Sequence, residues 1–275
     1  IGAHLDHLGY GDEGSLHRGE KAIHNGADDN ASGVAVLLAL AADLVEMDQA
    51  SANDYLFLAF SGEEKGLYRS NHWTKHPTLP ISTLNYMINL DMVGRLDTSN
   101  TIGVNGVGTS SAWAEVDRVR IGGLKAKTTT SGIGPSDHTS FYLQGIPAIH
   151  FFTGTHADYH KPSDDVEKIN FDGMLKVTRY IESLITSLND DGKVTFTDRP
   201  PGNAEAAQQQ QTAKPPPASE TRPMPQPAAS ATEPATAKKA NAAKATPADR
   251  PAAAPAEPKP VDEAFVPVEP EALDL

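Results

Sequence analysis

The segment DYLFLAFSGEEKGLYRSN, residues 54–71, runs from an apolar stretch into two adjacent glutamates and then into a helical pattern. The stretch YLFLAF is short and rich in aromatic and aliphatic residues, which is typical of a buried strand. Glu63 and Glu64 therefore lie where a strand ends and a helix begins. Paired glutamates at such a point are commonly a solvated helix start, favoured by the helix dipole. The alternative is that the carboxylates serve a cation, and the surrounding sequence decides between the two.

The alternation of strand and helix patterns continues on both sides of this segment. Strands are predicted at residues 54–60, 84–94 and 146–152, after a first strand that ends within GAHLDH (2–7). Helices are predicted at residues 31–47, 66–76, 111–121, 136–145 and 170–190. In the first helix the expected buried face consists of Val34, Leu37, Leu38, Ala41, Leu44 and Val45. Strands that alternate with helices predict an α/β fold of three layers, with helices on both faces of a mixed, mostly parallel central sheet.

The composition excludes several kinds of site and partner. The 275-residue chain contains no cysteine, which excludes disulfides, thiolate metal ligands and cysteine nucleophiles. The formal net charge is −13, and an acidic protein is a poor partner for nucleic acid or anionic lipid. No apolar run reaches the length of about 18 residues that a membrane span needs. Clustered acids and histidines suit cations better.

Composition also divides the chain near residue 198. From Arg199 onward Pro, Ala, Gln, Lys and Glu dominate, as in KPPPASETRPMPQP. Such a segment cannot bury enough apolar surface to offset its ordering entropy. We therefore predict one folded domain at residues 1–198 and a disordered tail or linker at 199–275, with a connection to another domain or partner left open. Because the chain starts inside a strand, we expect further sequence upstream of Ile1.

Acids and histidines cluster where the predicted strands end. His4 and Asp6 follow the first strand and share one face, because side chains alternate along a strand. A carboxylate at Asp6 can accept the second ring N–H of His4 and fix the tautomer of a metal-binding imidazole. The other candidates are Asp28, Asp29 and Asn30 in NGADDNASG, Glu63 and Glu64, Asp91 at the end of YMINLD, and His160 in HADYHKPSDD. Ligands in open α/β sheets bind beyond the carboxyl ends of the strands, so these five segments predict a metal site at that edge.

Each candidate has a simpler explanation when it is taken alone. Asp28 could be a helix N-cap, and a lone histidine after a strand is commonly a hydrogen-bonded surface residue. His150 lies inside an apolar strand, so we expect it to be buried and hydrogen-bonded rather than a ligand. The hypothesis of a metal site depends on the ordered set, because five independent coincidences at strand ends are improbable. No functional role is assigned to His17, His24, His72 and His76.

Six motifs carry a resemblance to a known family. GAHLDHLG, NGADDNASGVA, FSGEEKGLYRS, NLDMVGR, SDHTSF and DYHKPSDD, in this order, resemble the zinc aminopeptidases of peptidase family M28. The resemblance covers residues 2–185 and none of the tail. It implies a metallopeptidase catalytic domain with two zinc ions at the carboxyl edge of the sheet, acting on peptides with a free N-terminus. It also implies a secreted or periplasmic protein.

The same resemblance implies the metal ligands. His4 and Asp91 are expected at one zinc ion, and Glu64 and His160 at the other. Asp29 is expected to bridge both ions. The family usually has a cis peptide bond after this aspartate, here between Asp29 and Asn30.

Three further residues resemble the catalytic residues of the family. Glu63 is expected to be the general base, which explains why two glutamates are adjacent: one holds a metal and the other moves a proton. Asp6 is expected to support His4. Tyr159 resembles a tyrosine that donates a hydrogen bond to the oxyanion of the tetrahedral intermediate. Asp137, in the SDH motif, is expected to order the wall of the substrate pocket.

One departure and several rival functions accompany the resemblance. Many relatives have serine where this chain has His7. The His7 side chain could reach the rim of the site or face water, and we expect it to face water. Glutaminyl cyclases share the fold with a single zinc, and receptor ectodomains share it without metals, so a cyclase and a non-catalytic binding module are the alternatives. A carboxypeptidase or dipeptidase preference also stays open, because metal ligands define hydrolysis better than they define which chain end enters.

Overall fold

The computed structural model describes residues 1–46, 53–189 and 192–197. Its centre is a six-stranded sheet with the strand order β2-β1-β3-β6-β4-β5. All neighbouring strands are parallel except β4 and β6, which pair antiparallel. The strands are β1 (Gly2–His4), β2 (Leu58–Phe60), β3 (Met87–Leu90), β4 (Thr101–Asn105), β5 (Lys125–Thr129) and β6 (Ala148–Phe152). The mixed, mostly parallel sheet of the sequence prediction is confirmed.

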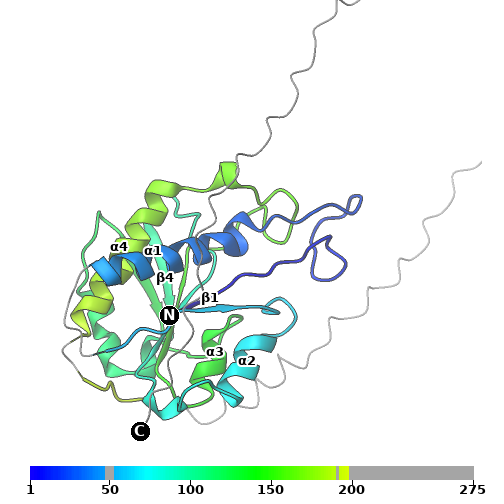
Figure 1. The fold of residues 1–275 in the computed structure, drawn as a ribbon. Coiled ribbons are helices and arrows are strands. Elements are labelled where there is room, and N and C mark those ends of the chain that lie inside the picture. The colour runs from blue at the N-terminus through cyan, green and yellow to red at the C-terminus, as the bar shows by residue number, and fades with distance from the viewer. Residues whose placement is uncertain (47–52, 190–191, 198–275) are drawn as a thin grey trace, which may run out of the picture. The chain divides into compact units, whose positions relative to one another are not determined.

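Helices cover both faces of this sheet (Figure 1). Helices α1 (Gly33–Glu46) and α4 (Phe171–Ser187) pack together on one face, and α2 (Tyr68–Lys75) and α3 (His138–Tyr142) pack together on the other. The shorter elements are the π-helical turn η1 (Ala27–Ser32) and the 3-10 turns η2 (Ile81–Thr83), η3 (Val107–Thr109), η4 (Ser111–Asp117) and η5 (Val166–Lys168). The predicted three-layer α/β architecture is therefore confirmed.

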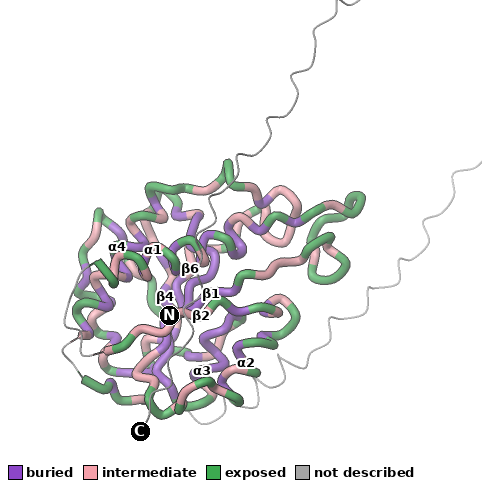
Figure 2. The backbone as a smooth tube through the Cα atoms, viewed as in Figure 1, coloured by how far each residue is buried: buried purple, intermediate pink, exposed green. Residues whose placement is uncertain are grey.

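Two apolar cores, one on each face, hold the layers together, and the central strands β1, β3 and β6 between them are buried (Figure 2). Neighbouring residues of β3 show the division: the side chain of Ile88 packs with α1 and α4, whereas that of Met87 packs with Phe141 of α3. Successive side chains of a strand point to opposite faces, which explains this separation. Each fully buried aliphatic side chain contributes about 1.5–3 kcal/mol. These buried strands hold the residues at the carboxyl edge of the sheet in fixed positions.

The predicted buried face of the first helix is partly wrong. The fully buried residues of α1 are Gly33, Val36, Leu37 and Leu40, whereas Leu38 is 65% exposed and Val45 81% exposed. Leu38 and Val45 are seven residues apart and therefore share one face of the helix. Because nearly every position of VAVLLALAADLV is apolar, the sequence pattern does not reveal which face is buried.

Other differences concern the extent of the elements. The predicted helix at 111–121 is the 3-10 turn η4, and the predicted strands at 54–60 and 84–94 shorten to β2 and β3. Strands β4 and β5 were not predicted. Strand β5 (KAKTT) is polar and lies at the edge of the sheet, and β4 (TIGVN) has only two buried residues, so neither has the apolar run of a central strand. The predicted disordered tail lies outside the described residues, and the boundary at residue 198 stays a prediction. Within the described ranges, no helix combines the length and apolarity needed to cross a membrane.

Candidate metal centre

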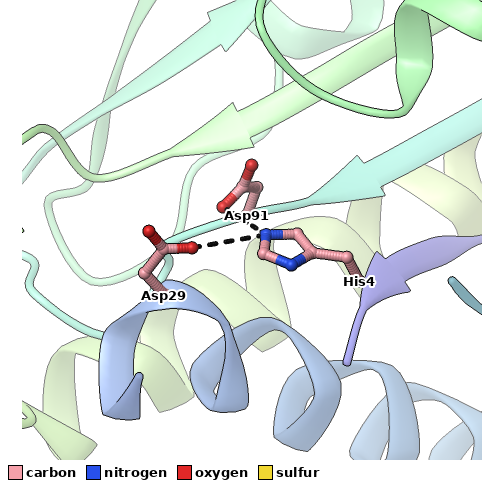
Figure 3. Close-up of side chains that lie close together, drawn as sticks. All are labelled: His4, Asp29 and Asp91. Atoms are coloured by element: carbon pink, nitrogen blue, oxygen red, sulfur yellow. Dashed lines mark hydrogen bonds and ion pairs between the residues drawn. The ribbon is translucent and has the colours of Figure 1, made fainter. Parts of the chain in front are cut away.

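His4 is the centre of a first group of potential metal ligands. It ends β1, and its side chain is 1% exposed. Its Nε2 atom lies 3.3 Å from Oδ1 of Asp29 and 3.4 Å from Oδ1 of Asp91, which follows β3 (Figure 3). In the close-up both carboxylates converge on the same ring nitrogen. One imidazole and two carboxylates thus meet at the carboxyl edge of the sheet.

His160 is the centre of a second group. Its Nε2 atom lies 3.0 Å from Oε2 of Glu64 and 3.3 Å from Oδ2 of Asp29. Its Nδ1 atom contacts the backbone carbonyl of Gly14 at 2.9 Å. An N–H donated to that carbonyl leaves Nε2 as the free ring nitrogen, which is the arrangement that orients a metal-binding histidine.

Asp29 belongs to both groups because its two carboxylate oxygens face different histidines. Oδ1 faces His4 and Oδ2 faces His160. The peptide bond between Asp29 and Asn30 is cis, as the resemblance implies. Asn30 fixes the turn: its Oδ1 accepts the backbone N–H groups of Gly33 and Met92, and its amide donates to the carbonyl of Leu90.

A buried polar network holds the η1 turn from the other side. One carboxylate oxygen of Asp164 accepts the backbone N–H groups of Asp28 and Asp29, at 2.9 and 3.1 Å. Its other oxygen pairs with the guanidinium of Arg95 at 3.3 Å. Asp28 is itself buried, with Oδ1 accepting the N–H of Gly94 and Oδ2 lying 3.1 Å from Nε2 of His156. Asp28 is therefore neither a simple N-cap nor a member of either ligand group, and it secures the loop that carries Asp29.

Glu63 and Asp6 lie beside the first group. The backbone N–H of Glu63 donates to Oδ1 of Asp6 at 3.4 Å. Nδ1 of His4 contacts the backbone carbonyl of Asp6 at 3.1 Å, whereas the nearest carboxylate oxygen of Asp6 is 3.8 Å away. The expected carboxylate contact with His4 is thus made by the main chain. Asp6 connects the turn after β1 with the turn after β2, and so connects His4 with Glu63.

The histidines partly offset the negative charges of the carboxylates that they contact. Burial alone would lower the pKa of His160, but its contacts with Asp29 and Glu64 outweigh burial and raise the pKa to about 10. Burial opposes the shift of Glu64 as well, yet hydrogen bonds with His160 and His7 lower its pKa to about 2. The pKa of Glu63 is raised well above its usual value by burial and by the charge of Asp91. The site therefore attracts positive charge, which is what a cation site requires.

The donor atoms of both groups match zinc. Zinc in proteins is held by imidazole nitrogen, carboxylate oxygen and thiolate, and the first two are present around His4 and around His160. A ring nitrogen of His7 also lies within 4.8 Å of carboxylate oxygens of Asp29 and Glu64, so the second group contains two histidines that could hold a metal. In the part of the chain that the structure describes, the ion pairs of lysine and arginine lie elsewhere. The carboxylates of Asp29, Glu64 and Asp91 thus have only histidines as cationic partners. The residues present fit two metal ions that share Asp29.

Two predictions about individual residues of the site need correction. His7 does not face water: its side chain is 8% exposed, and its Nδ1 lies 2.7 Å from Oε1 of Glu64. His150 is buried and hydrogen-bonded as expected: its Nδ1 lies 3.4 Å from the side-chain amide nitrogen of Asn105, whereas its Nε2 has no hydrogen-bond partner among the described residues. His24, which was expected at the surface, is buried and contacts the hydroxyl of Ser15 at 2.7 Å.

Tyr159 and Asp137 flank the two groups. The ring of Tyr159 stacks on the ring of His160, with centroids 3.8 Å apart, and burial together with Asp29 and Glu64 raises the pKa of its phenol. Asp137 is fully buried at the start of α3, where burial raises the pKa of its carboxyl to about 7. It is in neither ligand group. That Asp137 orders the wall of the substrate pocket stays a prediction.

Comparisons with known proteins establish the family of the chain. The chain belongs to peptidase family M28, whose model matches residues 1–185. It is 34% identical over 158 residues to aminopeptidase YwaD of Bacillus subtilis, a match that covers 53% of this chain and 34% of YwaD. Among solved structures, BSAP, a zinc aminopeptidase from Bacillus subtilis, is similar with a TM-score of 0.55 and 25% identity, over 70% of this chain and 48% of BSAP.

The fold extends beyond aminopeptidases. A glutaminyl cyclase from Porphyromonas gingivalis is similar with a TM-score of 0.53 and 20% identity, over 68% of this chain and 71% of the cyclase. This likeness concerns the fold alone. The chain spans about half the length, or less, of the two aminopeptidases.

Proposed function

We propose that this protein is a zinc aminopeptidase with two metal ions, which removes the N-terminal residue of peptides. The observation that carries the proposal is the orientation of Asp29, whose oxygens face His4 on one side and His160 on the other. Besides Asp29, His4 faces the carboxylate of Asp91, and His160 faces the carboxylate of Glu64. Two equivalent groups that share one carboxylate are the arrangement expected of a two-metal hydrolase.

We assign one zinc ion to His4, Asp29 and Asp91, and the other to Asp29, Glu64 and His160. Bound zinc supplies two functions to a hydrolase: it lowers the pKa of a coordinated water, and it polarises the substrate carbonyl. The residues around the two groups perform the remaining tasks.

Glu63 is the general base in this proposal. Its carboxylate belongs to neither ligand group, although its neighbour Glu64 does, and Asp6 fixes its backbone beside His4. Glu63 takes a proton from the attacking water and returns it to the leaving amine, so that one carboxylate serves both halves of the reaction. Tyr159, stacked on His160, donates its phenol O–H to the oxyanion that develops on the carbonyl.

The charge of the site indicates the class of substrate, and the family resemblance indicates the cellular location of the protein. A free N-terminal amine is a cation, and it is attracted to a site rich in carboxylates. Peptides with a free N-terminus are therefore the proposed substrates. Secretion or a periplasmic location, which the family resemblance implies, is part of the proposal.

Metal content and peptide hydrolysis test the function together. Zinc is measured in the purified protein by elemental analysis, and release of p-nitroaniline from a panel of aminoacyl p-nitroanilides is followed before and after chelation. Two zinc ions per chain with chelator-sensitive release support the proposal. One zinc ion without release, combined with cyclisation of a peptide that begins with glutamine, would show a cyclase. Absence of bound metal after zinc is supplied would overturn the proposal in favour of a binding module.

A further inference from the structure

His7 lies in the second ligand group, where its ring nitrogen and carboxylate oxygens of Asp29 and Glu64 are within 4.8 Å of one another, and it has a single short polar contact among the described residues. It follows Asp6 in the turn after β1, and its Nδ1 lies 2.7 Å from Oε1 of Glu64. The distance from the same nitrogen to Oδ2 of Asp29 is 3.9 Å, which is too long for a hydrogen bond. The other ring nitrogen, Nε2, is buried and has no hydrogen-bond partner among the described residues. Among the described residues, Glu64 is thus the hydrogen-bond partner of the His7 ring.

The two oxygens of Glu64 are divided between two histidines. Oε1 faces His7 at 2.7 Å, and Oε2 faces His160 at 3.0 Å. The side chains of His7 and Glu64 are 8% and 6% exposed, so water does not compete freely for either oxygen. A carboxylate with one oxygen occupied by a hydrogen-bond donor presents the other oxygen in a fixed direction.

The protein backbone holds the His7 ring in this position. Gly26 adopts a left-handed conformation with φ +62°, and a Cβ atom there would lie 2.8 Å from Cγ and Cδ2 of His7. Any larger residue at this position would displace the ring. On another side the ring meets His160 edge-on, with centroids 5.7 Å apart. A ring packed this closely keeps its Nδ1 aimed at Glu64.

We infer that His7 is a positioning residue for Glu64: it donates Nδ1–H to Oε1 and reserves Oε2 for the zinc ion shared with His160 and Asp29. This inference rests on the proposed function, because it takes Glu64 as a ligand of the second ion. It predicts that His7 acts on the affinity of one ion and leaves the ion at His4 and Asp91 unaffected.

Two substitutions separate positioning from ligation and from simple packing. His7→Phe keeps a ring against Gly26 and removes the donor. His7→Asn places an amide N–H near the position of Nδ1, so it can still donate to Glu64, but an amide is a poor zinc ligand. His17→Phe, at an exposed histidine of the same loop, is the matched control. Circular dichroism of the metal-free proteins establishes that each variant is folded.

The measurement is a zinc titration of the metal-free protein in competition with a chromophoric chelator. In His7→Phe we expect one of two binding steps to weaken about 10–100-fold, the usual cost of losing a partner of a metal ligand, and the other step to stay unchanged. We expect His7→Asn and His17→Phe to retain both steps. Unchanged binding in His7→Phe would overturn the inference. Equal weakening in His7→Asn, with an altered Co²⁺ absorption spectrum, would overturn it too, because His7 would then be a ligand. A wild type that binds fewer than two ions would refute the two-metal function itself.

Discussion

The buried carboxylate of Asp164 accepts the backbone N–H of Asp29 at 3.1 Å. The same oxygen accepts the N–H of Asp28 at 2.9 Å, and the other oxygen pairs with Arg95. Asp164 is fully buried, so its charge requires these partners. Asp164 thus links the segment that carries His160 to the turn that carries Asp29, and it sets the relative position of the two ligands.

Asp164→Asn is expected to weaken both the fold and the metal site. An amide accepts less strongly from two N–H groups and no longer neutralises Arg95, so we expect a loss of about 1–3 kcal/mol in the free energy of unfolding. Because Asp29 contacts both histidines, zinc affinity is expected to fall about 10–100-fold at both binding steps. Urea unfolding and chelator competition measure the two effects.

Asp165→Asn is the matched control for this substitution. Asp165 is the next residue, and its carboxylate accepts a hydrogen bond from Asn25 away from the ligands. The Asp165→Asn substitution is expected to leave the free energy of unfolding and the zinc affinity nearly unchanged. Wild-type zinc affinity in Asp164→Asn would show that the turn holds Asp29 without help from Asp164.

The same substitution at the two adjacent glutamates is expected to affect different properties, turnover at Glu63 and zinc content at Glu64. Glu63→Gln keeps the shape of the side chain and removes the base, so zinc content is expected to stay intact while kcat falls by about 10²–10⁴. Glu64→Gln removes a carboxylate that faces His160 at 3.0 Å, and it is expected to lower zinc content. Elemental analysis and turnover are measured on both variants. An active, zinc-loaded Glu63→Gln enzyme would remove Glu63 from the mechanism.

The sequence was sufficient to predict which residues converge, because strand ends of a parallel sheet meet at one edge. His4 and Asp91 lie directly at such ends, and Glu64 lies in the turn after β2, so their meeting follows from topology. Asp29 and His160 lie in the loops that follow the predicted strands, so the pattern placed them at the same edge, and the family resemblance then assigned each of them to a zinc ion. In the structure His4 contacts Asp29 and Asp91, and His160 contacts Asp29 and Glu64; that these five residues bind metal stays a prediction.

The supporting residues could not be predicted in the same way. Asp164 and Arg95 act through backbone N–H groups and a buried ion pair, and such contacts leave no periodic pattern in the sequence. His7 was expected to face water because its loop is polar and rich in glycine. Its burial depends on Gly26, which is distant in sequence and lets the ring pack closely. The one available signal was that His7 departs from the motif of the family that the chain resembles.

Asp137 is expected to make the stability of the metal-free protein depend on pH. Burial raises the pKa of its carboxyl to about 7, whereas an unfolded aspartate titrates near about 3.9. Between these values the folded state binds more protons than the unfolded state, so the free energy of unfolding decreases as pH rises from about 4 to about 7. Above that range both states are ionised, and this contribution becomes constant.

Asp137→Asn removes this contribution. At pH 8 we expect the variant to be more stable than the wild type by about 1–4 kcal/mol, from about 1.4 kcal/mol per unit of pKa shift, and the difference to vanish near pH 4. Urea unfolding in the presence of a chelator at both pH values measures it. The exposed Asp117→Asn is the control, with no expected change in the profile. Parallel profiles for wild type and Asp137→Asn would mean that Asp137 is ionised in the folded state.

Tyr159→Phe separates transition-state stabilisation from substrate binding. The phenylalanine ring preserves the stack on His160, with its 3.8 Å centroid distance, and removes only the O–H. Because a donor to the oxyanion acts in the transition state, we expect kcat to fall about 10–100-fold with KM nearly unchanged and zinc content intact. Tyr10→Phe, at a tyrosine that is 63% exposed, is the control and is expected to match the wild type. A rise in KM at constant kcat would instead assign Tyr159 to the wall that holds the substrate.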